Sequence, residues 1–237
     1  MTSLAKRNIT STRKQKVIDE HVAFVIPSAG IGYRLKAVGP KSLIRLDGGL
    51  TILEHQLLTI LRVYPNSEIL YVVGFENYKF NEYKKKYPIR LIYNSLYDKT
   101  NVLYSIGLGV QATTLRKIVV VYGDLVFNSP TITNIHAGGS KVVIDTRQQI
   151  SKEKVGVVLN KGVVTNFAYG VEPKWAQIAY LTGLELDLFE ETALDNKKRG
   201  WYGHESLNYV IDNGGKLTIF ESPDIEISEI RSKKDIP

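Results

Sequence analysis

The residues best suited to chemistry lie in one short segment, from Phe24 to Leu43. An apolar run is followed there by a loop of small residues, Ser28-Ala29-Gly30-Ile31-Gly32, and then by Arg34 and Lys41. Glycines allow backbone N–H groups to approach a phosphate closely. Arginine and lysine just beyond them supply fixed positive charge. The segment therefore predicts a loop that cradles a polyphosphate and two cations that stabilise charge developing on it.

Two glycines in a turn after a strand are not specific by themselves. The segment lacks the G-K-[ST] of a P-loop, and Leu35 follows Arg34 where a dinucleotide fingerprint would continue toward a third glycine. The positive charge of Arg34 and Lys41 just beyond the glycines favours phosphate binding over an ordinary turn, and the resemblance described below supports this choice.

A carboxylate follows a second apolar run, Val119 to Gly123, at Asp124. In open α/β sheets, ligands gather at the carboxyl ends of the strands. A carboxylate at that edge, facing bound phosphates, can hold Mg²⁺ through one or two oxygens. The alternative is a loop aspartate that caps a turn, and we favour the metal ligand.

The pattern of apolar residues predicts the elements that position these groups. A capping box at Thr51-x-x-Glu54 begins a helix that ends before Pro65. Further helices are expected over 102–113, 184–194 and 204–211. Strands are expected over 22–26, 68–73, 89–93, 118–122, 141–145, 155–159, 163–169, 177–182 and 217–220. The alternation in the first half predicts an α/β fold with a mostly parallel sheet and right-handed crossovers.

Composition narrows the class of protein further. The 237 residues suffice for one sizeable α/β domain, expected over 21–237, with residues 1–20 as a flexible extension. No apolar run approaches the ~18 residues that cross a bilayer, so no membrane partner is expected. The net charge of +7 comes partly from the first residues. Aromatic and basic residues do not alternate along a strand face as a nucleic-acid-binding surface would need, so no nucleic-acid partner is expected. The absence of cysteine fits a reducing, cytoplasmic environment.

The glycine loop and the residues after it resemble the G-x-G-x-R…P-K-x-L signature of nucleotidyltransferases that load sugar-phosphates and alcohol-phosphates onto nucleotides. A second block narrows the resemblance. Leu91-Ile92-Tyr93-Asn94, then Tyr97, Asn101 and Tyr104-Ser105, look like the L-I-Y-N…Y…N-x-x-Y-S pattern of bacterial choline-phosphate cytidylyltransferases. In that family the block lines the nucleotide and acceptor cleft, which makes Asn94, Asn101 and Ser105 candidates for nucleotide binding. Asn and Ser in a loop often only cap the following helix, and Asn101 is equally suited to that role.

The last residues resemble the same family's ending, E-[IM]-D-x-x-x-D-[LI], with one departure. Glu229, Ile230 and Asp235 fit, whereas the family's metal-binding aspartate falls on Arg231. An arginine cannot ligate Mg²⁺ and would repel it. Either Glu229 or Glu226 takes the role of second carboxylate, with Glu229 our candidate, or Asp124 and the substrate phosphates hold the metal with water. Arg231 is a candidate contact for an acceptor phosphate.

Candidates for the acceptor side are aromatic or charged. Four aromatics are suited to form a cage for a quaternary ammonium such as choline: Trp175, Tyr180, Trp201 and Tyr202. Glu205 lies close to the last two and could neutralise the cation. Core packing is the commoner role for such aromatics. Lys174 follows Glu172-Pro173, where related sugar nucleotidyltransferases place a substrate-binding lysine.

The resemblance implies a Rossmann-like, glycosyltransferase-A-like domain with a mixed, mostly parallel sheet flanked by helices and a smaller acceptor-side β/α portion. It implies transfer of a nucleotidyl group, cytidylyl favoured, from a nucleoside triphosphate to a phosphorylated small molecule, with Mg²⁺ as cofactor. Amides of Ala29, Gly30 and Gly32 would hold the triphosphate, with Arg34 on the leaving pyrophosphate and Lys41 on the α-phosphate. Two alternatives stay open: a sugar-1-phosphate nucleotidyltransferase, and a nucleotide-binding homologue impaired by Arg231. The sequence leaves the oligomeric state undetermined.

Overall fold

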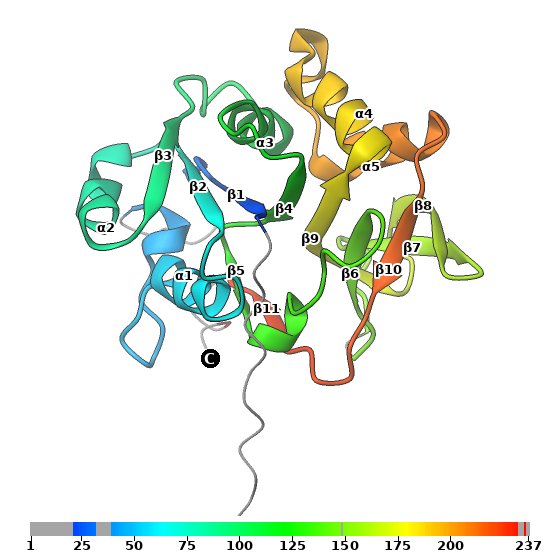
Figure 1. Ribbon diagram of the computed structural model, residues 1–237, viewed down its shortest axis with the longest axis horizontal. Helices are drawn as coiled ribbons and strands as arrows, with labels where there is room; N and C mark the ends of the chain where they lie inside the picture. Colours follow the sequence, from blue (N-terminus) through cyan, green and yellow to red (C-terminus); the bar gives the residue numbers. More distant parts are fainter. Residues whose placement is uncertain (1–20, 32–38, 148, 232–234, 236–237) are drawn as a thin grey trace, which may run out of the picture.

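The computed structural model describes residues 21–31, 39–147, 149–231 and 235 (Figure 1). Two predicted phosphate-loop residues, Gly32 and Arg34, and the expected extension over residues 1–20 lie outside these ranges. In the described part, the strands form a nine-stranded sheet in the order β3-β2-β1-β4-β9-β6-β10-β8-β7 and a two-stranded sheet of β11 and β5.

The first half of the large sheet is parallel. Its strands are β1 (Ala23–Ser28), β2 (Glu68–Val73), β3 (Ile89–Tyr93) and β4 (Lys117–Val121). β1 pairs in parallel with both β2 and β4. Since β2 and β3 continue in one direction from β1 and β4 lies on its other side, the strand order reverses at β1. Ligands of doubly wound sheets bind at such a reversal.

The second half of the sheet is mixed. β9 (Lys174–Thr182) runs antiparallel to both β4 and β6 (Lys141–Asp145), so the antiparallel share is larger than the sequence predicts. Its remaining strands are β7 (Val155–Asn160), β8 (Val163–Tyr169) and β10 (Leu217–Phe220). β7 and β8, both expected as strands, pair as a hairpin with Lys161 and Gly162 at positive φ in its turn.

Helices cover both faces of the sheet, and alternate residues of β1 divide between two cores. Phe24 and Ile26 pack with α1, whereas Ala23 and Val25 pack on the face of the other three long helices (Figure 1). The helices are α1 (Ile52–Val63), α2 (Asn81–Lys86), α3 (Val102–Gln111), α4 (Gly183–Leu194) and α5 (Gly203–Asp212). Short 3₁₀ segments span Lys41–Leu43, Asn77–Phe80, Ser129–Thr131 and Asn196–Lys198.

The expected α/β architecture is confirmed, and the predicted strand and helix segments are present. The capping box that begins α1 is formed, because the Thr51 hydroxyl accepts from the Glu54 N–H at 3.1 Å and Glu54 accepts from the Thr51 N–H at 3.1 Å. Two short strands were not predicted: β5 (Leu125–Phe127) and β11 (Ile227–Glu229). Three residues are too few for a periodic signal.

Within the ranges that the structure describes, every helix falls short of the length and apolar character needed to cross a membrane.

Candidate active site

A cleft of about 540 Å³ opens where β1 and β4 end. Ala29 and Gly30, from the loop after β1, line one side, and Asp124, from the turn after β4, lines another. Lys41 enters from the 3₁₀ segment that precedes α1. The fold thus brings together the predicted loop, cation and carboxylate that come from separate parts of the sequence.

Gly123 explains how the β1 and β4 loops approach so closely. Its N–H donates to the Pro27 carbonyl at 3.3 Å. A Cβ at this position would lie 2.1 Å from the Ser28 hydroxyl oxygen and 2.7 Å from the Pro27 carbonyl oxygen. A side chain here would therefore push the two loops apart, and only glycine permits the observed contact.

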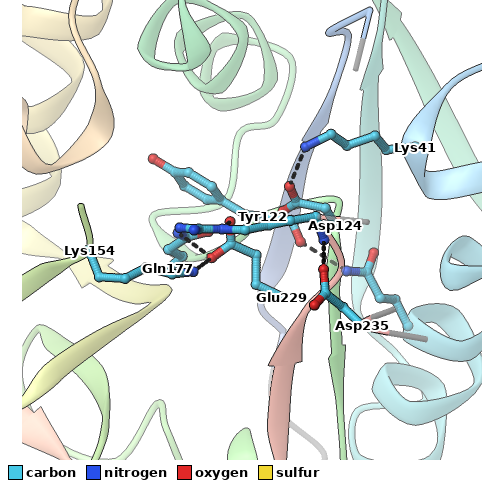
Figure 2. Close-up of polar contacts among 9 residues, drawn as sticks. Lys41, Tyr122, Asp124, Lys154, Gln177, Glu229 and Asp235 are labelled. Atoms are coloured by element: carbon cyan, nitrogen blue, oxygen red, sulfur yellow. Dashed lines mark hydrogen bonds and ion pairs between the residues drawn. The ribbon is translucent and has the colours of Figure 1, made fainter. Parts of the chain in front are cut away.

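Lys41 and Asp124 form an ion pair in the cleft, with 3.1 Å between Lys41 Nζ and Asp124 Oδ2 (Figure 2). Burial raises the pKa of Asp124 above its usual range, while Lys41 opposes the rise and the nearby Glu229 adds to it. A carboxylate in this state gains stability from any additional cation placed beside it. The pair thus suits a site where negative charge and a metal ion meet.

The Asp124 turn is held from behind by Gln56 of α1, which is fully buried. Its side-chain amide nitrogen donates at 2.9 Å both to the Tyr122 carbonyl and to the Leu125 carbonyl. Its oxygen accepts from the Tyr71 hydroxyl at 2.9 Å. Gln56 was not predicted, because a glutamine inside a helical pattern carries no signal of a distant partner.

Glu229 reaches the same cleft from the far end of the chain. β11 pairs with β5, Leu125 lying opposite Glu229, and the Ile230 N–H donates to the Asp124 carbonyl at 2.9 Å. The two carboxylates predicted to share a site are therefore on adjacent backbones. Burial opposes ionisation of Glu229, but hydrogen bonds from Lys154 and Arg231 outweigh it and lower the pKa of this carboxyl.

Both oxygens of Glu229 are engaged. Arg231 Nε donates to Oε1 at 2.8 Å, and Oε2 accepts from Lys154 and, at 3.3 Å, from Gln177 (Figure 2). Gln177 has a φ of +59° in a register shift of β9 against β6, a conformation uncommon for a residue with a side chain. This local distortion turns Gln177 into the cleft, where it is a lining residue.

The residues of the cleft fit a Mg²⁺ ion that is held by a single protein carboxylate, Asp124. In the described residues no group of three or more histidine, cysteine, aspartate or glutamate side chains is arranged to hold a metal. Asp124 is a desolvated carboxylate beside a space for phosphates, which suits an ion held by one protein carboxylate, phosphate oxygens and water. Glu229 does not fit the predicted role of second ligand in this arrangement, because cations already occupy its oxygens.

The three predicted nucleotide-binding residues after β3 have different positions. Asn101 and Ser105 line the cleft. Asn101 also caps α3 by accepting from the Val102 N–H at 2.8 Å. Asn94 is buried behind the wall, where it donates to Ser105 Oγ at 3.0 Å and to Thr100 Oγ1 at 3.2 Å. Asn94 therefore holds two residues of the cleft wall, Thr100 and Ser105, in place from behind.

The acceptor-side candidates do not form one cage. Tyr202 lines the cleft and is 49% exposed. Its N–H donates to the Glu205 carboxylate at 2.7 Å, a hydrogen bond that caps the start of α5. Trp201 is half-buried, with Lys198 Nζ 5.0 Å from its ring centre. Trp175 and Tyr180 are core residues, at 4% and 1% exposure, so burial excludes them from a ligand cage.

Two charged acceptor candidates lie outside this cleft. Lys174 and Arg231 line a second hollow, which shares the Glu229 side chain with the cleft.

Two serines that were not predicted as binding residues also line the cleft: Ser28, the first residue of the predicted loop, and Ser42. Their hydroxyl oxygens are buried and have no hydrogen-bond partner among the described residues. Buried polar atoms nearly always find a partner, so a wall that leaves two unpaired is suited to a polar ligand. Isolated serines in a loop give no sequence signal of this kind.

Comparisons with known proteins agree with this geometry. The chain is 27% identical over 190 residues to the choline-phosphate cytidylyltransferase of Haemophilus influenzae, covering 75% of this chain and 79% of that relative. Its structure is similar to the CTP:phosphocholine cytidylyltransferase of Streptococcus pneumoniae, with a TM-score of 0.76 and 18% identity over 91% of this chain and 96% of the other. The inositol-1-phosphate CTP transferase of T. maritima has the same TM-score, at 17% identity and 91% coverage of both chains.

No protein-family model matches the chain. The sequence similarity and the shared fold nevertheless confirm the predicted resemblance, and the chain is an enzyme of the nucleotidyltransferase type. Within that type, the similar proteins named above include enzymes that act with CTP.

Proposed function

We propose that this protein transfers a nucleotidyl group, cytidylyl in first place, from a nucleoside triphosphate to the phosphate of a small acceptor such as phosphocholine, with release of pyrophosphate. The observation that carries the proposal is the convergence of Ala29, Gly30, Lys41 and Asp124 around one cleft at the strand reversal. The named relative and the structural neighbour that act on phosphocholine support the choice of acceptor.

The chemistry asks little of the protein beyond alignment and charge. The phosphate oxygen of the acceptor is already anionic, so no general base or enzyme nucleophile is required. The amides of the Ala29–Gly30 loop would hold the triphosphate, and Lys41 would stabilise the charge that builds up on the α-phosphate as pyrophosphate departs. Asp124 would hold Mg²⁺, which supplies further neutralisation of the phosphates. Arg34, which lies outside the described residues, would neutralise the leaving pyrophosphate.

Replacing Lys41 by Met tests the central assignment. Because the variant loses the cation next to the reacting phosphate, turnover is expected to fall by about 10²–10³-fold. Pyrophosphate release is measured with phosphocholine and CTP, with and without Mg²⁺. Arg116→Gln is the matched control, because Arg116 precedes β4, at the opposite end from Asp124, and pairs with Asp187 and Glu190. Turnover of the Lys41→Met variant at the wild-type rate would contradict the assignment.

The two alternatives give different results in the same assay. A sugar-1-phosphate nucleotidyltransferase would release pyrophosphate with glucose-1-phosphate and UTP or dTTP rather than with phosphocholine and CTP. An impaired homologue is motivated by the occupied oxygens of Glu229. It would bind CTP, show no turnover with any acceptor, and gain none on Arg231→Asp.

A further inference from the structure

A second hollow, of about 340 Å³, adjoins the cleft. We call it the basic hollow, because Lys154, Lys174 and Arg231 line it, together with Glu229 and Asp235. Glu229 also lines the cleft. The two spaces therefore meet at one carboxylate, and a group bound in the basic hollow would be a direct neighbour of the proposed reaction site.

Glu229 forms ion pairs with two of the three cationic side chains that line the basic hollow. Lys154, just before β7, and Arg231, just after β11, both donate to its carboxylate (Figure 2). These side chains are largely shielded from water, with 16% of Lys154, 30% of Arg231 and 12% of Glu229 exposed. An ionic contact in such surroundings is stronger than one on an open surface. The carboxylate thus fills the space of an anion that the two cations would otherwise attract.

The charges of the basic hollow do not balance. Among the described residues that line it, three cationic side chains face two carboxylates, Glu229 and Asp235, and Lys154 is repelled by both Arg231 and Lys174. A guanidinium carries five N–H donors in a planar fork, and the contact of Arg231 with Glu229 through Nε uses one of them. Guanidinium groups bind phosphate oxygens in pairs, with geometry that a carboxylate shares.

We propose that the basic hollow binds a phosphate group through Lys154 and Arg231, and that Glu229 holds these two cations until the phosphate displaces it. The displaced carboxylate then faces the cleft, on the side of Asp124. Arg231, at the position where the sequence pattern leads one to expect a carboxylate, becomes a phosphate ligand, and Glu229 becomes available to a cation only when that phosphate is bound.

This inference deepens the proposed function and rests on it in naming the phosphate as that of the acceptor. Three cations would repel a quaternary ammonium, so an acceptor such as phosphocholine would direct its phosphate, and not its cationic end, toward Lys154 and Arg231. The acceptor class is accordingly a phosphomonoester dianion.

Calorimetric titration of the full chain with inorganic phosphate, without nucleotide or metal, tests the site. Arg231→Gln and Lys154→Gln are each expected to weaken binding by about tenfold, the loss of one charge-assisted contact. Glu229→Gln is expected to tighten it by about tenfold, because the internal competitor is removed. The distant Arg116→Gln is expected to leave it unchanged. Circular dichroism melts check folding, and Arg231→Lys replaces Arg231→Gln if that variant does not fold, with a smaller loss expected.

Two results would overturn the proposal: unchanged binding in Arg231→Gln or its substitute, or weaker binding in Glu229→Gln. A second titration with phosphocholine separates the two sources of phosphate. The acceptor assignment requires that Arg231→Gln weaken phosphocholine as it weakens inorganic phosphate, and a loss confined to inorganic phosphate would refute it. Because neither titration needs turnover, absence of pyrophosphate release with every acceptor would refute the proposed function and leave the phosphate site standing.

Discussion

Replacing Gln56 by Met removes the buried amide that holds the Asp124 turn while keeping a similar length and volume. The change leaves the carbonyls of Tyr122 and Leu125 and the hydroxyl of Tyr71 without their 2.9 Å partners. Each unsatisfied buried group costs about 1–3 kcal/mol. The Tyr122 carbonyl keeps a longer bond of 3.3 Å from the Leu125 N–H, and the Tyr71 hydroxyl keeps a contact of 3.4 Å to the Leu53 carbonyl, so the lower end applies. The expected loss in free energy of unfolding is about 3 kcal/mol.

Urea denaturation followed by circular dichroism measures this loss, and the melting temperature is expected to fall by about 9 °C. Tyr71→Phe, which removes one of the three contacts, should cost about 1.5 kcal/mol. The double variant should cost less than the sum of the single variants by about 1 kcal/mol, because both share the Tyr71–Gln56 hydrogen bond. A Gln56→Met protein within about 0.5 kcal/mol of wild type would refute the reasoning. So would strictly additive costs.

Two further predictions concern the start of α1 and the contact of the loops. Although burial opposes it, hydrogen bonds from Lys86, the Thr51 N–H and Tyr87 lower the pKa of Glu54 from 4.5 to about 2. The stability that this ionised carboxylate contributes is complete above about pH 4.5 and is lost as the pH falls toward 2. Glu54→Gln should therefore cost about 2 kcal/mol at pH 7 and flatten the acid limb of stability measured from pH 6 to 2; an unchanged limb would contradict this. Gly123→Ala should cost about 2–3 kcal/mol and reduce pyrophosphate release, since its Cβ would lie 2.1 Å from Ser28 Oγ. Gly48→Ala, where nothing lies within 4 Å, is its control, and equal melting temperatures for the two would count against the explanation.

The sequence was sufficient to predict the groups that border the strand reversal. Asp124 was predictable because a carboxylate directly after a buried apolar run must lie at the carboxyl edge of a sheet. Lys41 required the spacing to the glycine loop, and Glu229 required the resemblance of the last residues. The α/β class and the elements around these residues followed from apolar periodicity.

The contacts that decide what these groups do were not predictable. Glu229 meets Lys154 only because β11 returns beside β5, a pairing of strands too short to detect. Asn94 matches the family pattern, but burial turns its amide away from the cleft and onto Ser105. Such pairings depend on tertiary packing, which periodicity and composition do not encode.

The place of β11 also bears on the order in which the enzyme becomes competent. Asp124 and the glycine loop follow β4 and β1, two strands that pair with each other and are synthesised early. Glu229 and Arg231 emerge from the ribosome much later and dock through the Ile230–Asp124 backbone contact. During synthesis, Asp124 would therefore be present in the chain before Glu229 and Arg231 have been added. The basic hollow would therefore be completed late in synthesis, when the three-residue strand β11 docks beside β5.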